Sequence, residues 1–164
     1  MNVLIFQEDS TTINVGNHWP SVVASGALLL VTDALSGERT VGSYILSSCD
    51  LSASQIAEFL RLRGAAEALM ALATTYDVNA AQLLKQHIFD TSIQHNVTEL
   101  RRMIQAERFV ETCNNMTSNE RNELTLEWGH STEVYILTID ELREKYIIPF
   151  ILQVNSFIIG EPFA

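Results

Sequence analysis

Glu123-Leu-Thr-Leu-Glu-Trp-Gly-His-Ser-Thr-Glu-Val-Tyr-Ile-Leu-Thr-Ile139 is the stretch on which the predicted fold class depends. In its first half, Leu124, Leu126 and Trp128 alternate with polar residues, and this period of two is typical of a half-buried strand. The next four residues favour a turn, and the alternation then resumes. We therefore predict a β-hairpin over residues 123–139.

Further strand-like segments occur at both ends of the chain. Residues 3–6 and 27–32 are short apolar runs, and residues 40–46 have the composition of a hairpin partner for 27–32. Residues 13–15 and 157–159 are shorter candidates of the same kind. Strands are thus expected before residue 50 and again after residue 120.

The middle of the chain has helical patterns instead. Capping-box spacings begin at Ser52, Asn79 and Asn96, each of which precedes a Gln or Glu by three residues. Residues 65–76 contain a single charge, Glu67, and a helix that is apolar nearly all round is usually buried. We expect this segment to be the central helix of the core.

Strands at both ends and helices between them indicate an α+β protein. We predict antiparallel strands at both ends of the chain around a central block of three to four helices, with a single-layer sheet packed on the helices. A chain of 164 residues has the usual length of one domain. We therefore predict a single globular domain over residues 1–164.

The sequence lacks the familiar motifs for metal, phosphate or nucleophile chemistry. His18, His87, His95 and His130 form no metal-binding pair, and the seven glycines form no phosphate-binding loop. There is also no nucleophile elbow around a serine. We therefore expect no metal, no cofactor and no catalytic residues.

The two cysteines, Cys49 and Cys113, are too few for a disulfide framework, so we expect free thiols in a reducing cytoplasm. The N-terminus lacks a signal-peptide pattern, and no apolar run approaches the length of a membrane span. As an alternative, Cys49 is the nucleophile of a small cysteine-dependent enzyme, because the nearby start of a helix would lower the pKa of its thiol.

The charge balance indicates the kind of partner. The chain has 20 acidic and 10 basic residues and a net charge of −10, which repels nucleic acid and anionic membranes and attracts basic proteins. We expect a basic protein partner, no nucleic acid and no membrane. Arg101, Arg102 and Arg108 are expected to face solvent or to pair with the protein's own acids, as Arg63 would with Glu67.

Acidic residues gather around the predicted hairpin and the segment after it. We predict a partner-binding surface there, in which Trp128 is an aromatic anchor flanked by carboxylates. The residues of this surface are Glu120, Glu123, Glu127, Trp128, His130, Glu133, Asp140, Glu141 and Glu144.

Together these patterns favour a non-catalytic acidic protein-binding protein. We expect a bacterial inhibitor or immunity protein that neutralises a basic partner such as a nuclease toxin, in the manner of toxin–antitoxin pairs. A phage or plasmid anti-defence protein would have the same size and charge. A structural subunit of an oligomer, with a homodimer as one form, is a further alternative.

Overall fold

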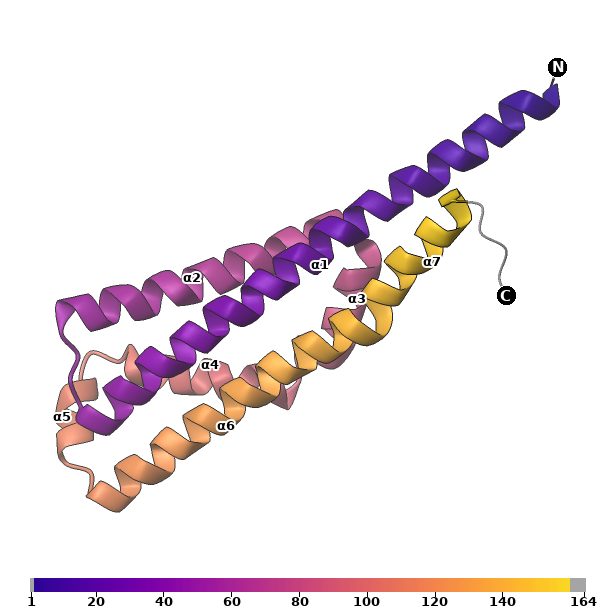
Figure 1. Cartoon of the computed structure of the whole chain (residues 1–164). Helices are drawn as coiled ribbons and strands as arrows, with labels where there is room; N and C mark the ends of the chain where they lie inside the picture. Colours follow the sequence, from indigo (N-terminus) through magenta and orange to yellow (C-terminus); the bar gives the residue numbers. More distant parts are fainter. Residues whose placement is uncertain (1, 160–164) are drawn as a thin grey trace.

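The chain is built of helices joined by short turns (Figure 1). The computed structural model describes the backbone of residues 2–159 and the side chains of residues 19–153. Its elements are α1 (Asn2–Ser48), α2 (Ala53–Tyr76), α3 (Val78–His87), α4 (Ser92–Ile104), α5 (Phe109–Asn114), α6 (Ser118–Leu142), the π-helical turn η1 (Arg143–Ile147) and α7 (Ile148–Ile159).

No strand occurs between residues 2 and 159, so the prediction of an α+β fold with a single-layer sheet and antiparallel strands at both ends is wrong. Residues 27–32 and 40–46 belong to α1, and residues 123–139 belong to α6. The physical reason is that each apolar run is part of a longer segment whose buried residues follow the helical period.

Helix α6 shows this reason most clearly. Trp128, Tyr135, Ile139 and Leu142 are buried, and their spacings of 7, 4 and 3 residues place them on one side of a helix. The alternation that indicated a hairpin spans only a few residues on either side of Gly129. Packing of the whole side against α1 overrides that local preference.

A capping box starts α6. The Thr117 hydroxyl accepts a hydrogen bond from the Glu120 backbone N–H at 3.2 Å, and the Thr117 N–H donates to the Glu120 carboxylate at 2.6 Å. This backbone hydrogen bond, supported by the Thr117 side chain, lowers the pKa of Glu120. The start of α6 is therefore set by local hydrogen bonds as well as by packing.

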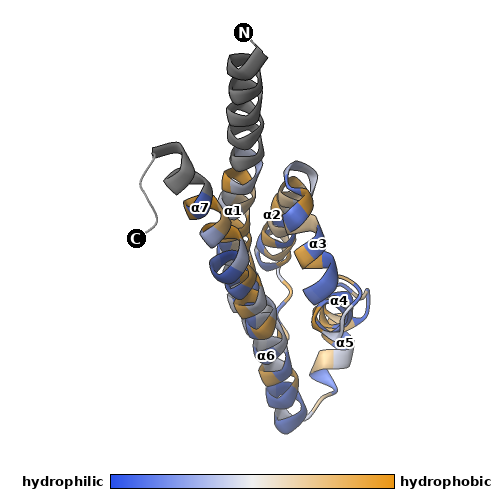
Figure 2. Ribbon diagram, turned by 90° about the vertical axis from the view of Figure 1, so that its right-hand side faces the viewer, coloured by the Kyte–Doolittle hydropathy of each residue, from blue (hydrophilic) through white to orange (hydrophobic). Residues whose placement is uncertain are grey.

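Helix α1 lies at the centre of the bundle (Figures 1 and 2). Helix α2 runs antiparallel along it, and α6 packs along another side. Helices α3, α4 and α5 connect the end of α2 to the start of α6. Residues 65–76, which we predicted as the central helix, lie in the peripheral α2, where Met70 and Ala73 are buried but Leu72 and Tyr76 are exposed.

Burial on several sides explains why α1 is so apolar. Leu28, Val31, Leu35 and Ile45 are completely buried. The segment Trp19–Ser48 is long and apolar enough to cross a membrane, judged by length and composition alone, although none was predicted. Core helices of bundles share these properties, and 44% of its most apolar window is already buried against neighbouring helices.

A close approach between α1 and α6 depends on Gly42. A Cβ atom at Gly42 would lie 2.5 Å from the indole of Trp128, so only a glycine leaves room for that ring. The indole N–H of Trp128 donates to the backbone carbonyl of Arg39 at 3.0 Å, and its ring centroid lies 5.9 Å from that of Phe59. This contact joins α1, α2 and α6.

Cys49 and Cys113 form a disulfide that links the end of α1 to α5. The two residues are 64 positions apart, their Cα atoms are separated by 5.6 Å, and both side chains are buried. The prediction of free thiols is therefore wrong. The predicted cytoplasmic location was based in part on free thiols, so it stays a prediction that the cysteines no longer support.

Candidate functional site

Helix α6 places most of the predicted partner-binding residues on its solvent side. We call the exposed residues at helical spacing the α6 outer face, and it consists of Glu123, Leu126, His130, Glu133, Leu137 and Glu141 of α6 together with Glu144 of the adjoining η1. Leu126 is 72% exposed and Leu137 is 59% exposed, and they are 11 residues, or about three helical turns, apart. This face combines carboxylates with exposed apolar side chains.

Trp128 does not belong to this surface. Its side chain is completely buried against α1, so the prediction of an exposed aromatic anchor is wrong. In a hairpin Trp128 could have projected beside its acidic neighbours, but in a helix it lies on the opposite side from Leu126. The exposed apolar side chains of α6 are instead Leu126 and Leu137, which were not among the residues predicted for this surface.

The other predicted residues lie around the edge of the α6 outer face. Glu120 is engaged in the capping box, Glu127 is exposed on the flank towards α4, and Asp140 is half-buried. On the face itself, Glu133 lies 3.7 Å from Arg39, and Glu141 pairs with Lys145. The remaining carboxylates of Glu123 and Glu144 have no basic partner within residues 19–153.

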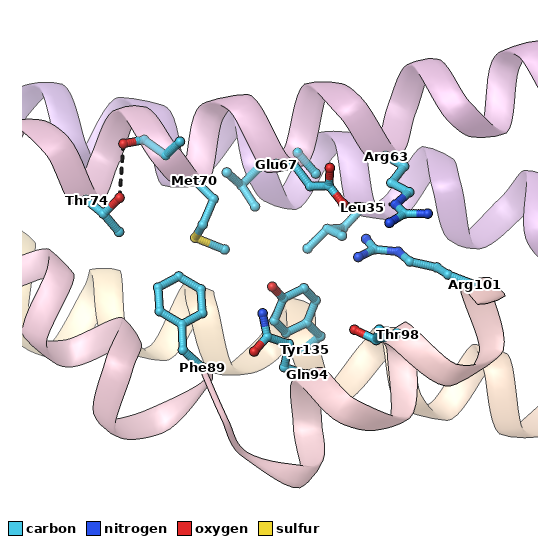
Figure 3. A pocket seen from close by; sticks show the side chains of 13 residues that line it. Leu35, Arg63, Glu67, Met70, Thr74, Phe89, Gln94, Thr98, Arg101 and Tyr135 are labelled. Atoms are coloured by element: carbon cyan, nitrogen blue, oxygen red, sulfur yellow. Dashed lines mark hydrogen bonds and ion pairs between the residues drawn. The ribbon is translucent and has the colours of Figure 1, made fainter.

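A second candidate site is a cavity of about 340 Å³ that we call the α2–α4 cavity (Figure 3). Helices α1 and α6 complete its walls. Apolar lining comes from Val31, Leu35, Ala66, Met70, Ala71 and Phe89, and polar lining from Arg63, Glu67, Thr74, Gln94, Thr98, Arg101 and Tyr135.

Arg101 is held in the cavity wall by Glu38 of α1. Its Nε and Nη2 atoms each donate to a Glu38 oxygen at 2.7 Å, and Glu38 is completely buried. Burial alone would lower the pKa of Arg101, but the hydrogen bonds and charge of Glu38 more than offset it and raise that pKa. Arg101 is therefore a fixed cation with a rigid orientation.

Tyr135 of α6 contributes a hydroxyl to the same cavity. The residue is only 6% exposed, and its hydroxyl makes no hydrogen bond to any of the residues 19–153. Burial raises the pKa of Tyr135 above its ordinary value. The hydroxyl faces the cavity and is free to donate to a molecule that enters it.

The cavity has a polar end and an apolar end (Figure 3). Arg63 and Arg101 lie at one end, Met70 and Phe89 lie at the other, and the Tyr135 hydroxyl points into the space between them. This order follows from the antiparallel course of α2 and α4 along the cavity. Such an arrangement suits a small ligand with one polar group and an apolar body.

The sequence offered partial signals for this cavity. The predicted pairing of Arg63 with Glu67 is confirmed at 2.9 Å, and Arg101 does pair with an acid of this protein. Glu38, the acid concerned, was not singled out, although it is among the few charges in the apolar second half of α1. Tyr135 was assigned to a strand, which concealed its position.

The remaining predicted chemistry has no assembled site within residues 19–153. No group of histidine, cysteine or acidic side chains there could hold a metal ion. Three of the four histidines are exposed, namely His87, His95 and His130. The fourth, His18, lies outside the described side chains. Cys49 is bonded to Cys113, so in this state its sulfur is not available as a nucleophile.

In comparisons with known proteins, no family model, curated protein or solved structure matches the chain.

Proposed function

We propose that the chain is a non-catalytic protein-binding protein whose α6 outer face docks against a basic partner. The observation that supports this proposal is the composition of the face. Four of its seven residues are glutamates, two are exposed leucines, and none is lysine or arginine. The face runs along the 25 residues of α6 and into η1, and the other side of α6 is packed against α1, so its side chains are presented at fixed spacings.

The two kinds of side chain have different roles in docking. Carboxylates attract a basic surface and raise the association rate, which falls as salt screens the charges. Burial of Leu126 and Leu137 would supply most of the affinity, at about 1.5–3 kcal/mol for each leucine removed from water. A nuclease toxin is a suitable partner because its phosphate-binding cleft must be positive.

A charge reversal tests the proposal. Glu123→Lys/Glu144→Lys replaces the two carboxylates of the face that have no basic partner in residues 19–153. Immobilised wild-type protein is expected to capture a basic protein from its native host at low salt, and the double variant is expected to lose most of that capture. Leu126→Ser should weaken capture independently of salt, because it removes apolar area.

The matched control is Glu107→Lys/Glu111→Lys, which changes the net charge equally at exposed positions outside the α6 outer face. This control should retain the captured protein. Equal loss in both double variants would mean that net charge, and not the α6 outer face, is responsible, and the proposal would then fail.

A further inference from the structure

We infer that the α2–α4 cavity binds a small monocarboxylic acid, with the carboxylate at the Arg101 end and the apolar body towards Met70 and Phe89. The inference rests on the side chains that line the cavity and is independent of the α6 outer face. It therefore assigns to this chain a small-molecule site in addition to the proposed protein-binding surface.

Donor groups with no acceptor among residues 19–153 indicate the polar group of the ligand. Glu38 engages one N–H of Nε and one of Nη2 of Arg101, which leaves three N–H groups, one on Nη2 and two on Nη1. The Tyr135 hydroxyl is a further donor, on a side chain that is more than nine-tenths buried. Both groups line the same cavity, so a ligand with two acceptor oxygens on one carbon would satisfy both.

The charges at this end favour an anion over a neutral ligand. Arg63 and Arg101 bring two guanidinium groups to the cavity, and each is paired with one carboxylate. The Glu67 carboxylate is 56% exposed and is therefore screened by water, whereas Arg101 is buried. The four charges of these two pairs cancel, so an added carboxylate would be held by the edge of the Arg101 guanidinium that Glu38 leaves open.

The apolar end limits the size of the ligand. Met70 and Phe89 offer contacts to a hydrocarbon chain or ring, and the flexible Met70 side chain can adapt to its shape. A volume of about 340 Å³ lies near the lower limit for small-molecule sites. One aromatic ring or a short chain therefore fits.

The test is a titration of the full oxidised chain with phenylacetate, followed by two-dimensional NMR of the backbone amides. Phenylacetate should shift amides of α2 and α4 beside the cavity in a saturable manner. Its neutral isostere phenylacetamide should bind at least tenfold more weakly, because it lacks the charge that Arg101 and Arg63 attract.

Two variants locate the binding. Tyr135→Phe removes only the hydroxyl and should weaken phenylacetate by about tenfold or more, while the melting temperature of the free protein stays unchanged because the hydroxyl has no partner in residues 19–153. Ala71→Leu should weaken binding, because it places a larger side chain at the solvent-exposed edge of the cavity. Tyr76→Phe, on an exposed tyrosine of α2, is the control and should bind as the wild type does.

Three results would overturn the inference. Phenylacetamide binding as tightly as phenylacetate would remove the role of the carboxylate. An unchanged affinity in Tyr135→Phe, or unchanged binding in Ala71→Leu, would place the ligand elsewhere. Failure of phenylacetate to shift any amide beside the cavity would show that the Tyr135 hydroxyl and Arg101 Nη1 serve no ligand of this class.

Discussion

Glu38 and Arg101 form a buried ion pair between α1 and α4, although Arg39 is next to Glu38 in sequence. Their bidentate geometry and the complete burial of Glu38 make the pair dependent on both partners. Removing one partner leaves the other charge buried without a counter-charge. An apolar pair of similar volume has no buried charge and therefore no such desolvation cost. The pair therefore specifies how α4 docks more than it raises stability.

We predict that Glu38→Gln lowers the free energy of unfolding by about 3–5 kcal/mol, because Arg101 is left buried without a counter-charge. The double variant Glu38→Leu/Arg101→Met should recover most of that loss. Urea unfolding followed by circular dichroism measures both. Glu99→Gln is the control, because Glu99 pairs with Arg102 at the surface and should cost less than about 1 kcal/mol.

Single-residue signals in the sequence were accurate only in part. Ser52 caps α2 as predicted, with its hydroxyl accepting from the Gln55 N–H. The cap of α3 is Asp77, two residues before the predicted Asn79. Helix α4 begins after Thr91 rather than at Asn96. Capping patterns are short and recur by chance, so they locate helices better than they locate helix ends.

At the level of elements, the contact between Gly42 and Trp128 sets the distance between α1 and α6. Gly42 lies inside a long helix, where glycine is usually unfavourable by about 1 kcal/mol relative to alanine. It is retained at a position where a Cβ atom would overlap the indole. The helix propensity lost at Gly42 is offset by the burial of a whole tryptophan side chain.

We predict opposite effects for two glycine substitutions in α1. Gly42→Ala should lower the free energy of unfolding by about 1–3 kcal/mol, because the indole of Trp128 must shift. Gly26→Ala should raise it by about 0.5–1 kcal/mol, because nothing lies within 4 Å of the new methyl group. Thermal unfolding of both variants compares them directly, and a stabilising Gly42→Ala would contradict the packing described here.

The hairpin prediction for residues 123–139 failed because two periods coexist in that segment. Leu124, Leu126 and Trp128 alternate, yet Trp128, Tyr135 and Ile139 also recur at the helical period. The choice between them depends on burial against α1, which no local window contains. In the middle of the chain, the helical period does not coexist with a strand-like alternation, so the helices there were easier to identify.

For the whole molecule, the disulfide between Cys49 and Cys113 encloses α2, α3 and α4 in one covalent loop. Its sequence separation of 64 residues makes the loop long, and long loops lose the most chain entropy when they are closed in the unfolded state. Such bonds persist in oxidising compartments. The disulfide therefore favours the folded bundle mainly by restricting the unfolded chain.

We predict that reduction of this disulfide lowers the free energy of unfolding by about 2–5 kcal/mol. Guanidinium unfolding with and without dithiothreitol measures the change, and Cys49→Ser/Cys113→Ser should match the reduced protein and be insensitive to the reductant. If dithiothreitol leaves the wild-type midpoint unchanged, the two sulfurs are not joined in solution.

The two candidate sites were predictable to different extents. The acidic residues of the α6 outer face were identified because charge is a property of composition, although Trp128 was wrongly included among them. The α2–α4 cavity joins residues from α1, α2, α4 and α6, and its key donors, Arg101 and Tyr135, meet only through the tertiary fold. The spacing of residues along the sequence does not show which residues of different helices line the same cavity.

The burial of Trp128 also gives the protein an internal optical probe. The chain has two tryptophans, of which Trp19 is 67% exposed and Trp128 is completely buried beside Gly42. In a Trp19→Phe variant, fluorescence would come from one indole at the junction of α1, α2 and α6. In the purified protein, its emission wavelength would then report directly on whether these three helices are in contact.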